Sequence, residues 1–94
     1  MGQEAAYCLS AGVQVRREKF GLLFYDYRGP RLYFAPTRDL IQEGFFAGQV
    51  TVADLTGSIC EANGGWPRNL VQGWIERTLE TLVGKGLICE QSVC

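Results

Sequence analysis

The densest run of strand-forming residues lies between positions 13 and 36, where apolar and aromatic side chains recur at short intervals. It holds most of the chain's phenylalanines and tyrosines, which suit a pleated, half-buried surface. Gly21 separates a first segment from a second, and a turn at Gly29 and Pro30 separates the second from a third. We therefore expect three antiparallel strands, with the third, from Arg31 to Ala35, at an edge of the sheet.

Three helices are expected to follow the strands and cover them. The first is predicted from an N-cap at Thr37 to a stop at Gly48. Its apolar stripe consists of Leu40, Ile41, Phe45 and Phe46. The second is predicted to begin at Thr51, with Asp54 in the capping-box position, and to end in the Asn63-Gly64-Gly65 turn.

The third predicted helix begins near Trp66 and runs to Gly84 or Gly86. Its apolar positions cover about 220° of the helix, whereas one face against a core needs only about 100–140°. We assign the surplus to the side that carries Ile75, Leu79 and Val83. This helix is therefore either sandwiched between other elements or awaits a partner. The residues assigned to the core, with no functional role, are Phe20, Leu22, Phe24, Leu32, Phe34, Leu55, Ile59, Trp74 and Leu82.

These elements indicate an α+β fold in which an N-terminal three-stranded antiparallel sheet packs on a three-helix bundle, an arrangement similar to a winged helix. Residues 1–12 are expected to form a flexible lead-in, and residues 13–94 a single domain. Leu87 to Cys89 are expected to form either a short final strand or a tail lying on the core.

Composition and charge limit the classes of function that we expect for this chain. The net charge is −1 with a pI near 5.3, and the sheet half is mildly basic whereas the helical half is acidic. The chain contains no histidine, and its four cysteines show no C-x-x-C spacing. We therefore expect no metal, no cofactor and no catalysis by a histidine-activated nucleophile, so the protein is not an enzyme. We also expect a cytoplasmic location, reduced cysteines and no membrane partner.

Two kinds of binding protein fit a small sheet followed by helices. A winged-helix DNA-binding regulator would place its third helix in the major groove, but here that helix is not basic and the whole chain is slightly acidic, so we expect no nucleic-acid partner. A peptide-binding domain would use the exposed edge of the third strand, to which an extended peptide can add as a further strand. The alternative is a bare edge beside a fully buried helix.

The run Val15-Arg16-Arg17-Glu18-Lys19-Phe20-Gly21-Leu22-Leu23-Phe24-Tyr25, followed by Arg31-Leu32-Tyr33-Phe34, resembles the opening of the mycofactocin-system peptide chaperones. The later stretches 51–55 and 82–88 are similar to the broader PqqD-like family. The resemblance implies a winged-helix-like recognition element that binds the leader of a ribosomally made precursor peptide and presents it to a radical S-adenosylmethionine maturase. It also implies that the domain itself holds no cofactor.

The resemblance implies that the leader lies against the third strand and the third helix. A homodimer formed through the same edge strand is an alternative use of it. The residues expected to bind the peptide are Arg31, Leu32, Tyr33, Phe34 and Ala35 on the strand and Arg68, Val71, Gln72, Ile75, Glu76 and Leu79 on the helix. Within the strand, we expect Arg31 and Tyr33 to face the ligand and Leu32 and Phe34 to face the core.

Overall fold

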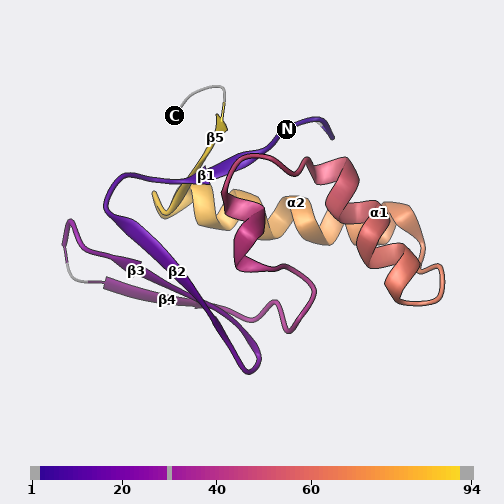
Figure 1. The fold of residues 1–94 in the computed structure, drawn as a ribbon, viewed down its shortest axis with the longest axis horizontal. Helices are drawn as coiled ribbons and strands as arrows, with labels where there is room; N and C mark the ends of the chain where they lie inside the picture. Colours follow the sequence, from indigo (N-terminus) through magenta and orange to yellow (C-terminus); the bar gives the residue numbers. More distant parts are fainter. Residues whose placement is uncertain (1–2, 30, 92–94) are drawn as a thin grey trace.

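The computed structural model describes residues 3–29 and 31–91, which form an α+β fold (Figure 1). The elements in chain order are β1 (Tyr7–Leu9), β2 (Val13–Glu18), β3 (Gly21–Asp26), β4 (Arg31–Ala35), the 3-10 turn η1 (Glu43–Phe46), α1 (Val52–Ala62), α2 (Arg68–Gly84) and β5 (Ile88–Glu90). No helix in the described ranges is long and apolar enough to cross a membrane.

The predicted three-stranded antiparallel sheet is confirmed, with strand order β2-β3-β4. Register is set by the short turn between β2 and β3, which places Glu18 opposite Gly21. Gly21 has no room for a side chain, because an added Cβ would lie 2.0 Å from the carbonyl oxygen of Ala35. The strand β4 pairs with β3 alone and forms one edge of the sheet, as the sequence predicts.

The two faces of this sheet differ from the prediction at β4. Leu22 and Phe24 on β3 are fully buried, and the register places Ala35 and Tyr33 of β4 beside them on the inner face. Leu32 and Phe34 therefore lie on the opposite face, where their side chains are 62% and 42% exposed. Their assignment to the core is wrong, as is that of Phe20, which lies exposed in the β2–β3 turn.

Two α-helices form instead of a three-helix bundle. The capping box of Thr51 and Asp54 begins α1 as predicted, and α2 spans the third predicted helix. The first predicted helix is wrong, because the chain from 37 to 48 contains only the single turn η1. Arg38 there adopts a left-handed backbone with φ of 56°, which stops a helix that begins at Thr37.

The N-terminal segment is part of the fold and not a flexible lead-in. β1 pairs antiparallel with β5, and the side chain of Tyr7 is buried against Phe45 of η1. Of the two expectations for the C-terminal segment, the short strand is the one that forms. Figure 1 shows this two-stranded sheet at the top of the view, beside the C-terminal end of α2 and away from β4.

The cysteines in the described ranges are of two kinds. Cys8 and Cys60 carry free thiols, whereas Cys89 is disulfide-bonded. The expectation of uniformly reduced cysteines is therefore wrong at Cys89.

Candidate functional site

The outer edge of β4 presents backbone groups of Leu32 and Phe34. The amide of Tyr27 donates to the carbonyl oxygen of Gly12 at 2.8 Å, so the odd-numbered amides of β3 turn toward β2 and the even-numbered ones toward β4. Phe24 of β3 is opposite Tyr33, whose amide accordingly turns inward to β3. By the same alternation, the amides of Leu32 and Phe34 turn outward, away from the sheet.

A groove lies between this edge and α2. It encloses about 190 Å³ and combines the inner-face side of β4 with one flank of the helix. Its lining residues are Tyr33, Ala35, Pro36 and Thr37 from the strand and the loop after it, and Trp74, Arg77, Thr78, Thr81 and Leu82 from α2. The strand and the helix that the sequence predicts as a binding site thus meet in a groove, but through a different face of the helix.

The predicted helical face is largely core. Ile75 and Leu79 are fully buried, and Val71 is nearly so. Of the three residues to which we assign the surplus apolar surface, Val83 alone is exposed. The stripe of Ile75 and Leu79 packs inward, whereas the groove is lined by the neighbouring stripe that contains Trp74, together with Leu82 from the buried stripe. The two stripes are offset by one residue, so they face directions about 100° apart around the helix axis.

The three polar residues predicted on this helix lie away from the groove. The guanidinium of Arg68 donates to the carbonyl oxygen of Ala53 in α1 at 3.3 Å. The amide of Gln72 donates to the carboxylate of Glu76 at 3.3 Å. Burial is the main cause of the raised pKa of Tyr7, and the negative charges of Glu90 and Glu76 raise that pKa further.

Thr37 supplies an unsatisfied hydrogen-bonding group at the groove. Its side chain is 1% exposed, and its Oγ1 finds no hydrogen-bond partner among the described residues. A buried hydroxyl without a partner is uncommon in folded proteins and costs about 1–3 kcal/mol. Because Thr37 also lines the groove, a ligand there can supply the missing partner.

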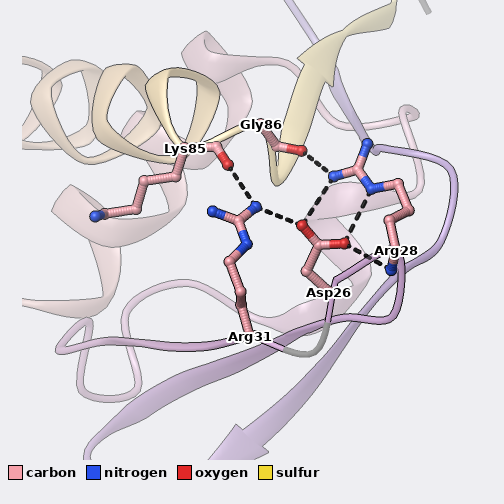
Figure 2. Close-up of polar contacts among 5 residues, drawn as sticks. All are labelled: Asp26, Arg28, Arg31, Lys85 and Gly86. Carbon is pink, nitrogen blue, oxygen red and sulfur yellow. Dashed lines mark hydrogen bonds and ion pairs between the residues drawn. The ribbon is translucent and has the colours of Figure 1, made fainter.

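A buried carboxylate ties the β3–β4 turn to the C-terminal end of α2 (Figure 2). Asp26 is 3% exposed and accepts hydrogen bonds from the backbone amide and the guanidinium of Arg28, at 3.1 and 2.9 Å, and from the guanidinium of Arg31. The two arginines also donate to carbonyl oxygens that follow α2, Arg28 to Gly86 at 2.7 Å and Arg31 to Lys85 at 3.2 Å.

This cluster of Asp26, Arg28 and Arg31 sets where β4 lies relative to α2. The guanidinium of Arg31 makes an ion pair with Asp26, while 58% of its side chain stays exposed, so its contact with a ligand remains a prediction. Lys85 adds a further tie, because its ammonium group lies 4.7 Å from the ring centre of Tyr33.

Asp26→Asn should destabilise the fold at neutral pH and reduce its sensitivity to acid. Hydrogen bonds from Arg28 and Arg31 hold the pKa of Asp26 well below its usual range. A carboxylate with a lowered folded-state pKa stabilises the fold above its unfolded pKa of about 3.9, and that contribution is lost as the pH falls below it. Thermal unfolding of both proteins at pH 7 and pH 3 should show a large difference that shrinks on acidification.

Asp39→Asn serves as the control for this measurement, since Asp39 is exposed on the loop after β4. An equal loss of stability for Asp26→Asn at both pH values would show that the cluster is held by packing and not by charge.

Neither metal-ligating side chains nor similarity to known proteins adds to the description of the site. No group of three or more histidine, cysteine, aspartate or glutamate side chains that could hold a metal ion occurs in the described part of the chain. No family model, curated protein or solved structure matches this chain.

Sequence reasoning misses five lining residues of α2, which are Trp74, Arg77, Thr78, Thr81 and Leu82. Their spacing places them on one helical flank, and this is the signal that could have identified them. Trp74, assigned to the core, is only partly buried and lines the groove.

Proposed function

We propose that this chain is a non-catalytic recognition domain that binds a peptide in extended form along the outer edge of β4, beside α2. The peptide is the leader of a ribosomally synthesised precursor, and the domain presents it in the cytoplasm to a radical S-adenosylmethionine maturase. In this proposal the fold is of the winged-helix-like PqqD type, with η1 in the place of the first helix and α1 and α2 as the second and third.

The observation that carries the proposal is the edge strand β4 and the groove next to it. Backbone groups at Leu32 and Phe34 turn outward, where a peptide strand can pair with them. Such pairing gives affinity that tolerates many sequences, while side-chain pockets give specificity. The groove between β4 and α2 supplies such a pocket on one side of the added strand.

The position of the Asp26 cluster supports the same proposal. It fixes the Arg31 end of β4 against the end of α2, so the groove exists before any ligand arrives. A preformed groove lowers the ordering cost that a bound peptide must offset.

A backbone-methylation scan of bound peptides tests the proposal. Twelve-residue peptides are first selected by display from a random library against the intact protein, and the best one is resynthesised with a single N-methyl group at each position in turn. Strand addition should make methylation costly, by about tenfold or more, at every second position, because alternate amides of a strand face the partner edge.

Matched side-chain substitutions to alanine at the same positions serve as the control. Sensitivity that repeats every three to four residues would indicate a bound helix instead, and a uniform tolerance of methylation would contradict backbone pairing. A selection that yields no binding peptide would also count against the proposal.

A further inference from the structure

A second cavity lies next to the groove and has a volume of about 340 Å³. It shares the lining residues Pro36 and Trp74 with the groove, so the two are neighbours. The other lining residues are Arg38, Leu40, Ile59, Trp66, Pro67, Leu70 and Val71. The walls are therefore almost entirely apolar, with a single cation.

Two large apolar residues that line this cavity are exposed to solvent. Leu70 is 64% exposed and Trp66 is 41% exposed, although both are large and apolar. Clustered exposed apolar surface beside a cavity is typical of a binding site. The exposed apolar surface that we expect at Ile75 and Leu79 is therefore found at other residues. It lies on the first two turns of α2 and on the segment before the helix.

Charge specifies the ligand further. Arg38 lines the cavity and Arg77 lines the groove, and no carboxylate lines either of them within the described residues. Neither arginine makes an ion pair in the described part of the chain. The left-handed φ of 56° at Arg38 is an uncommon conformation for a residue other than glycine, of the kind that clusters at binding sites.

We infer that this cavity is a specificity subsite for the bound peptide, and that it takes a large aliphatic or aromatic side chain next to an acidic residue paired with Arg38. The inference rests on the proposed function. Four residues of this chain lead from Phe34 to Arg38, so a peptide lying alongside reaches the cavity within about four residues of the segment that pairs with β4. Thr37 lies between Phe34 and Arg38 in the chain, and its buried hydroxyl is available to a polar group of the peptide.

Intrinsic fluorescence reports on this subsite directly, because both tryptophans of the chain line the cavity. The probe is the best peptide from the displayed library, with three variants: the apolar residue changed to alanine, the acidic residue changed to its amide, and both changes together. Saturation with the parent peptide should shift the tryptophan emission, and the alanine variant should bind at least about tenfold more weakly and lose the shift.

Arg38→Asn tests the ionic half of the subsite, since asparagine tolerates the left-handed backbone at this position. In the unchanged protein, converting the acidic residue to its amide should weaken binding by about five- to tenfold. In Arg38→Asn the acid and the amide should bind equally, and in Arg38→Lys the preference for the acid should persist.

The outcomes separate this inference from the proposed function. An every-second-residue methylation pattern with no tryptophan response, or with an acid preference that Arg38→Asn leaves unchanged, supports strand addition and overturns the subsite. A tryptophan response and an Arg38-dependent acid preference without that pattern support the subsite and overturn strand addition. Selected peptides that lack a paired apolar and acidic residue overturn the subsite whatever the methylation pattern is.

Discussion

Leu79→Ala should lower the free energy of unfolding by about 2–5 kcal/mol, whereas Leu70→Ala should change it by less than about 0.5 kcal/mol. Leu79 is fully buried at the centre of α2, so truncation leaves a cavity among well-packed neighbours. Leu70 is 64% exposed on the same helix. Urea unfolding followed by circular dichroism measures both values with the same chemical change in the same element.

The two substitutions should have the opposite order of effect on peptide binding. Leu70 lines the subsite cavity and Leu79 does not, so Leu70→Ala should weaken binding while the fold stays intact. A stable Leu79→Ala protein with weakened peptide binding would show that the face of α2 predicted from the sequence is the functional one after all.

Tyr33→Pro should lower the stability of the fold, whereas Phe34→Pro should lower the affinity for peptide, although the two residues are neighbours. Proline removes the amide hydrogen, and at Tyr33 that amide turns inward to β3, so the substitution should disrupt the hairpin and cost about 1–3 kcal/mol or more. At Phe34 the amide turns outward, and prolines are tolerated at such edge positions. Phe34→Pro should therefore remain folded and lose at least about tenfold in affinity for a selected peptide.

Phe34→Ala is the matched control, because it removes the side chain and keeps the amide. Thermal unfolding and fluorescence anisotropy with a labelled selected peptide give the two quantities for all three variants. Peptide binding that is unchanged in a folded Phe34→Pro protein would contradict backbone pairing at this edge.

The elements with strong local signals could be predicted from the sequence. The strand β4, the short turns of the sheet and the capping box of α1 all depend on residues close together in the chain. The segment of Leu40, Ile41, Phe45 and Phe46 has a pattern that also fits a helix, but Gly44 weakens a helix there and Arg38 prevents its start. A loop and a single 3-10 turn place Ile41, Phe45 and Phe46 in the core instead, and Leu40 is partly buried.

The face of α2 that we propose to bind the peptide could not be found from periodicity alone. Apolar residues occupy two adjacent stripes of this helix, one with Ile75 and Leu79 and the other with Leu70 and Trp74. Which stripe is buried depends on how α2 packs against α1 and β5, and the periodicity of the helix does not encode that packing. The same limit applies to β4, where period-two alternation cannot say which of the two faces meets the core.

The ends of the fold depend on pairing between distant segments. Tyr7 looks like an isolated aromatic residue in a polar lead-in, and it becomes buried only because β1 pairs with β5 at the other end of the chain. The Asp26 cluster also could not be predicted from the sequence. Its arginines donate to backbone carbonyl oxygens that follow α2, and backbone groups leave no signature in the sequence.

Hydrogen exchange of the β4 amides, with and without a saturating selected peptide, is the most direct measurement of the central claim. In the free protein the amides of Tyr33 and Ala35 should exchange slowly and those of Leu32 and Phe34 quickly, because only the first pair turns toward β3. Bound peptide should slow the exchange of Leu32 and Phe34 by at least about tenfold. Unchanged exchange at Leu32 and Phe34, with new protection confined to η1 or β1, would contradict the assignment of β4 as the peptide-binding edge.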